Sequence, residues 1–146
     1  MARMTVDAKA VLCKLEAAKQ AVQRDVVEAV NDCADDLIRV SSEIAPHDKG
    51  ILEKSHAREV APKGDQVTAT IAYSVNEGEF NYAMAMHERE YNLGPGSSAK
   101  PGTEGMSGTH YSVGNKYLTR PLEGEAKVYR EHITQILRNA IKRECD

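Results

Sequence analysis

The stretch "VDAKAVLCKLEAAKQAVQRDVVEAVNDCADDLIRVSSEI", residues 6–44, decides the fold because it contains neither glycine nor proline. Apolar residues recur in it at steps of three and four, which is typical of an amphipathic helix. Their positions are Val11, Leu15, Ala18, Val22, Val26, Val30, Cys33, Leu37 and Ile44. Thr5 or Asp7 can cap the start, and Pro46 disfavours helix just before it. We therefore expect a long helix over residues 6–44.

The length of this helix poses a problem for a compact domain. A continuous helix would be about 58 Å long at about 1.5 Å per residue, whereas a domain of this size is about 30 to 35 Å across. Either the helix overhangs, and a copy of the chain or another subunit covers its apolar stripe, or it breaks into two antiparallel halves. Weak helix formers at residues 30–36 make that segment the expected place for a break.

The middle of the chain reads as strands. Val67, Ala69, Ile71, Tyr73 and Val75 alternate with more polar residues, a pattern of period two that predicts a strand. A short strand at residues 57–61 and a turn at residues 62–65 would complete a hairpin with it. Phe80, Tyr82, Met84 and Met86 also alternate, and we expect a third strand there that passes into a helical turn near His87.

A glycine-rich segment, "GPGSSAKPGTEGMSGTHYSVG", covers residues 94–114. So long a loop is expected to be disordered or to become ordered against a partner. "KYLTRPL" then predicts an extended piece, and residues 123–143 a second amphipathic helix with the stripe Ala126, Tyr129, Ile133, Ile136 or Leu137, and Ala140. The fold class is α+β, one domain over residues 1–146 with a sheet of three to four antiparallel strands and the loop within residues 57–120.

Composition restricts the function. The net charge of −3 gives no general attraction to nucleic acid or to an anionic membrane, and no apolar window is long enough for a membrane span. The three cysteines, Cys13, Cys33 and Cys145, are far apart and odd in number, so we expect reduced thiols in a protein made in the cytoplasm.

The fragment "MHEREY", residues 86–91, begins like the zinc-protease motif His-Glu-x-x-His. That site needs two histidines one helical turn apart on one metal ion, and Tyr91 stands at the second position. The other histidines lack ligand spacing, no cysteine lies in an activating environment, and the glycine-rich segment lacks phosphate-loop spacing. We expect no enzyme activity, no catalytic residue, no metal and no cofactor.

Three segments together resemble a known family. "APHDKGILEKS" at residues 45–55 is similar to the "APVDTGxLRxS" segment of phage neck proteins, the tail-completion or minor capsid, head-tail joining proteins of long-tailed bacteriophages. "NYAMAMHE" at residues 81–88 is similar to their "YAxxxHE" segment, and "KYLTRPL" at residues 116–122 to their "KFLExPL" segment. The order of the segments also matches over nearly the whole chain, although the loop is long and Lys49 replaces the usual threonine.

The resemblance implies a non-catalytic subunit of the joint between capsid and tail, assembled as a ring, most often a hexamer. Its implied structural residues are Pro46, Asp48, Gly50, Tyr82, His87, Glu88, Tyr117, Leu118 and Pro121. The implied partners are copies of itself and other neck proteins such as a head-closure protein, a tail terminator or the tail tube. DNA would pass through the ring without sequence-specific binding. The implied location is the virion neck, after assembly in the host cytoplasm.

The glycine-rich loop is the candidate contact with these partners, through Gly94, Pro95, Lys100, Glu104, His110 and Tyr111. We expect deletion of residues 94–114 to leave the fold intact and to abolish joining. Glu88 is expected to be a hydrogen-bonding or inter-subunit charge partner. Two other classes stay open: a small dimeric regulatory or adaptor module that pairs through its long helix, and a zinc hydrolase that uses His87 and Glu88.

Overall fold

The computed structural model describes residues 3–47 and 50–146. Its first element, α1 (Ala8–Ile44), is one unbroken helix, about 56 Å long at about 1.5 Å per residue. The Asp7 side chain accepts a hydrogen bond from the Ala10 backbone N–H at 3.2 Å, which confirms one of the two predicted caps. The helix is followed directly by Ala45 and Pro46, as the proline predicts.

The alternative in which α1 breaks at residues 30–36 is wrong. Cys33 and Ala34 are buried in the middle of this segment, and the Asn31 side chain donates to the Val27 carbonyl oxygen at 3.0 Å. Tertiary packing therefore outweighs the weak intrinsic helix propensity of these residues.

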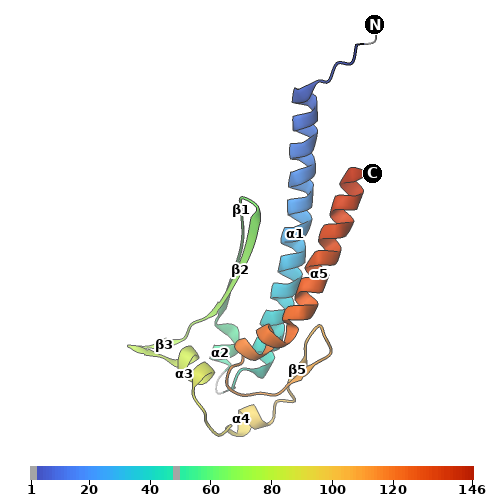
Figure 1. The fold of residues 1–146 in the computed structure, drawn as a ribbon. Helices are drawn as coiled ribbons and strands as arrows, with labels where there is room; N and C mark the ends of the chain where they lie inside the picture. The colour runs from blue at the N-terminus through green and yellow to red at the C-terminus, as the bar shows by residue number, and fades with distance from the viewer. Residues whose placement is uncertain (1–2, 48–49) are drawn as a thin grey trace.

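The C-terminal helix, α5 (Thr119–Cys145), runs antiparallel to α1 (Figure 1). Tyr129 packs in a buried cluster with Cys33 and Leu37 of α1, and Arg143 forms an ion pair with Asp25 at 2.9 Å. The expected apolar stripe is confirmed, because its members are buried or half-buried. The extended piece expected at "KYLTRPL" is wrong in its second half, since α5 begins at Thr119 and takes Pro121 into its first turn, where proline costs little.

The predicted hairpin is confirmed. It consists of β1 (His56–Lys63) and β2 (Gln66–Tyr73), paired antiparallel from His56 opposite Tyr73 to Lys63 opposite Gln66. The turn is tighter than expected, and Gly64 adopts a positive φ of 59° there. The hairpin lies along α1 (Figure 1), and its tip is attached where Gln23 donates to the Gly64 carbonyl oxygen at 3.0 Å.

The expected sheet of three to four strands is not found among the described residues. Three separate two-stranded sheets occur instead: the hairpin, β3 (Asn76–Glu77) with β4 (Phe80–Asn81), and β5 (Thr103–Glu104) with β6 (His110–Tyr111). Two one-turn helices complete the chain, α2 (Ile51–Lys54) and α4 (Pro95–Ser98).

The third strand expected at residues 80–86 is mostly helix. After β4 the chain forms α3 (Tyr82–Glu88), and the Asn81 side chain caps it by accepting from the Met84 N–H at 3.0 Å. Ala83 and Ala85 face the protein interior. Alanine and methionine favour helix, and in so short a segment two apolar faces of a helix imitate a period of two.

Among the described residues, no helix is both long and apolar enough to cross a lipid bilayer.

Candidate functional site

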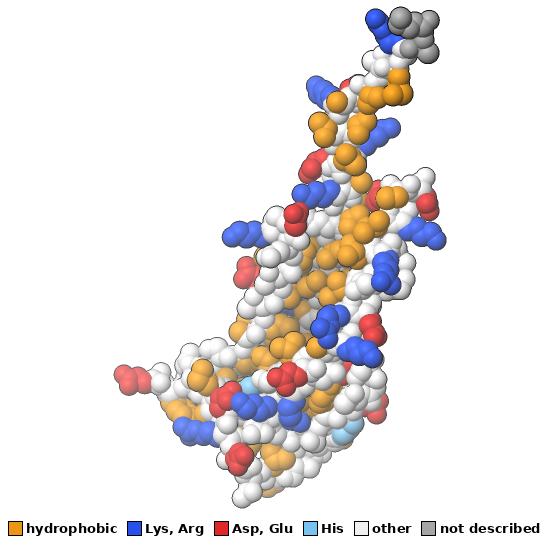
Figure 2. All heavy atoms as spheres, viewed as in Figure 1, with side chains coloured by type: hydrophobic (Ala, Val, Ile, Leu, Met, Phe, Trp, Pro, Cys, Tyr) orange, Lys and Arg blue, Asp and Glu red, His pale blue; other side chains and the backbone are white. Residues whose placement is uncertain are grey.

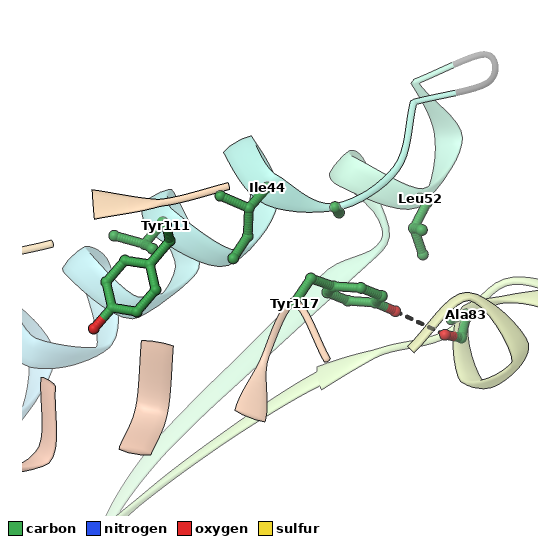
Figure 3. Close-up of a cluster of buried hydrophobic side chains, with 7 residues drawn as sticks. Ile44, Leu52, Ala83, Tyr111 and Tyr117 are labelled. Atoms are coloured by element: carbon green, nitrogen blue, oxygen red, sulfur yellow. Dashed lines mark hydrogen bonds between the residues drawn. The ribbon is translucent and has the colours of Figure 1, made fainter. Parts of the chain in front are cut away.

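The three segments that carry the family resemblance meet at the C-terminal end of α1. There the phenolic O–H of Tyr117, from the third segment, donates to the Ala83 carbonyl oxygen of the second at 2.8 Å (Figure 3). Leu52, from the first segment, lies in the same buried cluster with Ile44. Burial raises the pKa of Tyr117 above its ordinary value, so the phenol stays a hydrogen-bond donor. The segments are thus parts of one core, which we call the foot.

The turn between α1 and α2 closes the foot on one side. Pro46 is buried, and Gly50 has a φ of 74°, a left-handed conformation that favours glycine. The His47 ring bonds the Glu53 carboxylate at 2.7 Å. Asp48, the third residue implied for this turn, lies outside the described residues.

His87 and Glu88 connect α3 to the start of α5. The carboxylate of Glu88 lies 2.7 Å from His87 Nδ1 and forms an ion pair with Lys116. The hydrogen bond from Lys116, with that from His87, lowers the pKa of Glu88. Within one chain Glu88 is thus a hydrogen-bonding partner, the first of its two expected roles, and the inter-subunit role stays a prediction.

The imidazole of His87 caps helix α5. Because a carboxylate only accepts, Nδ1 carries the proton, and Nε2 accepts from the Thr119 hydroxyl at 3.1 Å and from the Thr119 backbone N–H at 3.4 Å. That N–H is one of the helix-start donors that lack a partner within the helix. His87 therefore acts as a cap of helix α5. Its partner Thr119, and Lys116, the ion-pair partner of Glu88, were not singled out from the sequence. The described residues contain no group of three His, Cys, Asp or Glu side chains placed to hold a metal ion.

The glycine-rich loop is packed against its own chain, so the expectation of a loop ordered only by a partner is wrong. The Lys100 ammonium group donates to the Ala45 carbonyl oxygen at 2.7 Å and to the Glu53 carboxylate at 2.9 Å, which holds the loop at the C-terminal end of α1. The hydroxyl of Ser97 accepts from the His47 N–H at 2.8 Å. The guanidinium of Arg39 donates to the Glu104 carbonyl oxygen at 2.7 Å.

The other candidate loop residues divide by exposure. Gly94, Pro95 and His110 are exposed, whereas Tyr111 is buried in the foot. Deletion of residues 94–114 would remove Tyr111 from that core. The burial of Tyr111 argues against the expectation that the fold survives this deletion, which stays a prediction.

Glu125 is a buried residue that the sequence patterns did not single out. It is fully buried in α5 and accepts from the Ser107 backbone N–H at 2.8 Å, from the Ser107 hydroxyl at 2.7 Å and from the Tyr111 hydroxyl at 3.0 Å. A carboxylate can be buried when several donors bind it. Its place in the helix pattern, four residues before the buried Tyr129, was the available signal.

The other candidate site is a surface along the N-terminal half of α1. The helix continues past the residues where its neighbours are attached, because the hairpin tip bonds Gln23 and the end of α5 bonds Asp25. Before this point Val11, Leu12 and Leu15 are 46%, 64% and 61% exposed. We call residues 8–18 the overhang.

A groove lies next to the overhang, between the hairpin and α5. Val22 and Val26 of α1 line it with Val67 of the hairpin and Leu137 of α5, and its volume is about 230 Å³. Figure 2 shows the hydrophobic side chains as a band that runs through this region and continues along α1 toward the N-terminus. The overhang and the groove thus form one elongated apolar surface.

Compared with family models, with curated proteins and with solved structures, the chain gives no match.

Proposed function

We propose that this protein is a structural subunit of the neck of a long-tailed phage, where it completes or terminates the tail and joins it to the head by assembling into a ring, expected to be a hexamer. It would act without catalysis, metal or cofactor, in the virion, after assembly in the host cytoplasm. Its partners would be its own copies and adjacent neck or tail proteins, with DNA passing through the ring without sequence-specific contacts.

The observation that carries this proposal is the overhang. The overhang extends beyond the hydrophobic core of its own chain. Burial of its apolar side chains against another subunit would stabilise an assembly by about 25 cal/mol per Å² of apolar surface. Val11, Leu12 and Leu15 are on such a stripe, and they are exposed in the single chain. An obligate assembly would bury them, whereas a protein that acts alone gains nothing from exposing them.

The foot supports the proposal in a second way. The three segments similar to the neck family, far apart in the sequence, pack into one core through Leu52, Ala83 and Tyr117. Residues that share a core are expected to recur together in a family, so their resemblance is better explained by a common fold than by three separate coincidences.

A dimeric binding module is the second candidate, because one further copy could also cover the overhang. It predicts a dimer at every concentration.

The test is head-tail joining in a phage that encodes this chain. Leu15→Asp places a charge on the exposed apolar stripe without touching the core, and we expect filled heads and separate tails in electron micrographs. Ala17→Asp, two residues on and about 200° around the helix, is the matched control and should give joined particles. Joined, infectious particles from Leu15→Asp would refute the role of the overhang.

A further inference from the structure

We infer that the overhang of one copy of this chain binds in the groove of another copy. The chain carries an exposed apolar helix stripe and, beside it, an apolar groove. A second copy could supply a groove for the stripe and a helix for the groove at the same time. Any unrelated partner would have to provide a groove for the stripe and a helix for the groove.

The size and lining of the groove fit side chains from a helix. The groove has a volume of about 230 Å³. Small-molecule sites are typically larger, at about 300 to 1,000 Å³. Three valines and a leucine line it, and its two charged lining residues, Lys19 and Asp65, are paired with each other. Val11 and Leu15 are one helical turn apart on the overhang, so they can enter a groove of this kind together.

The charges around both surfaces fit an encounter between copies. The rim of the groove carries Lys19 and Asp65, which form an exposed ion pair at 3.3 Å. The overhang carries Lys14 and Glu16, one on each side of Leu15. Each surface therefore carries one positive and one negative side chain that can pair with opposite charges on the other surface. Neither surface has the uniform positive charge that attracts nucleic acid or an anionic membrane.

This contact would be the interface between subunits in the proposed ring. That the contact closes a ring rests on the proposed function. A head-to-tail contact between two different surfaces forms a ring when the rotation closes, and the same two surfaces can also pair in a two-fold dimer. Head-tail joining in the phage tests the function, and association of the purified protein tests this contact, so the two can fail separately.

Mixing two variants of the purified protein tests the contact. Leu15→Asp spoils the overhang and keeps the groove, whereas Val67→Glu spoils the groove and keeps the overhang. Each variant alone should associate about tenfold or more weakly than the unaltered chain in sedimentation equilibrium. Mixed together, they should form a one-to-one complex, because one intact overhang then meets one intact groove.

Matched controls keep the test specific. Ala17→Asp lies opposite the stripe, and Thr68→Glu lies on the other face of β2 from Val67. Both should associate like the unaltered chain. Circular dichroism should give all four variants the same helix content, and a variant that lost helix would be replaced by Val11→Asp or Leu137→Glu.

Three results would overturn the inference. An unaltered chain that stays at its single-chain mass at high concentration would assign the groove to a different protein. Single variants that associate normally would place the contact on another surface. Variants that associate weakly alone and form no mixed complex would indicate pairing of overhang with overhang or of groove with groove.

Discussion

The phenolic oxygen of Tyr111 lies 3.0 Å from Oε1 of Glu125, and both side chains are buried. This hydrogen bond joins the glycine-rich loop to the C-terminal helix. Burial, with the neighbouring Glu125 carboxylate, raises the pKa of Tyr111 to about 12, so the bond keeps its donor at physiological pH. The loop is thus held by the core of its own chain.

Glu125→Ala should lower the free energy of unfolding by about 1 to 3 kcal/mol, because it leaves the buried Tyr111 hydroxyl and the two donors of the exposed Ser107 without their acceptor. Urea denaturation at neutral pH measures the change. Glu123→Ala, at an exposed position two residues earlier, should change the stability by less than about 0.5 kcal/mol. Equal effects of the two substitutions would mean that Glu125 does not hold the loop.

Gly124→Ala should destabilise the protein although alanine is the better helix former by about 1 kcal/mol. A Cβ at this position would overlap the Tyr111 hydroxyl, which lies against the glycine. The melting temperature should therefore fall. A rise, as helix propensity alone predicts, would show that the loop does not pack against α5 at this point.

Tyr117→Phe removes only the hydrogen bond to the Ala83 carbonyl oxygen and should cost about 1 kcal/mol. Tyr117→Ala also removes the buried ring and should cost about 3 to 5 kcal/mol. Urea midpoints of the two variants separate the contributions. If Tyr117→Ala cost no more than Tyr117→Phe, Tyr117 would not be part of the core of the foot.

Stability should fall in acid through Asp36. Burial alone would raise its pKa, but hydrogen bonds donated by Arg39, Tyr129 and the Met106 backbone outweigh burial and lower it. A carboxyl whose pKa is lower in the folded state adds stability above its unfolded pKa of about 3.9, and this stability is lost as the pH falls through the folded value. Urea midpoints at pH 7 and pH 3 measure the loss. Asp36→Asn should be less stable at pH 7 and lose less in acid, whereas an unchanged acid loss would contradict this role.

The thiols should differ in reactivity. Cys13 and Cys145 are exposed, whereas Cys33 is buried, and burial, with Asp32 and Asp36 nearby, raises the pKa of Cys33 to about 11. Iodoacetamide at pH 8 should label the two exposed cysteines first, and Cys33 only after unfolding. Peptide mass spectrometry resolves the three sites, and early labelling of Cys33 would contradict its packing between α1 and α5.

The elements with long, regular patterns could be predicted from the sequence. The stripe that includes Leu15 and Leu37 predicted α1, and the alternation through Ile71 predicted β2. The prediction of a strand at residues 80–86 was wrong because the apolar pattern of seven residues fits both a strand period of two and a helix period of about 3.6. The Asn81 side chain caps the segment and stabilises it as a helix.

The ordered loop could not be predicted because its partners are distant in the sequence. Lys100 bonds Ala45, and Tyr111 bonds Glu125. Glycine content indicates freedom of the backbone, and here the lack of side chains at Gly105 and Gly124 lets the chain approach Glu125 and Tyr111 closely. The overhang could be predicted from the length of the helical pattern, because a helix of 37 residues is longer than one domain of this size is wide.

The most direct test of the central claim is the mass of the purified protein in solution, measured by light scattering across a range of concentrations. A subunit that closes a ring through its overhang should move from the single-chain mass toward that of a closed ring, expected to be a hexamer, as the concentration rises. A mass of two chains at every concentration would contradict the ring and favour the dimeric binding module.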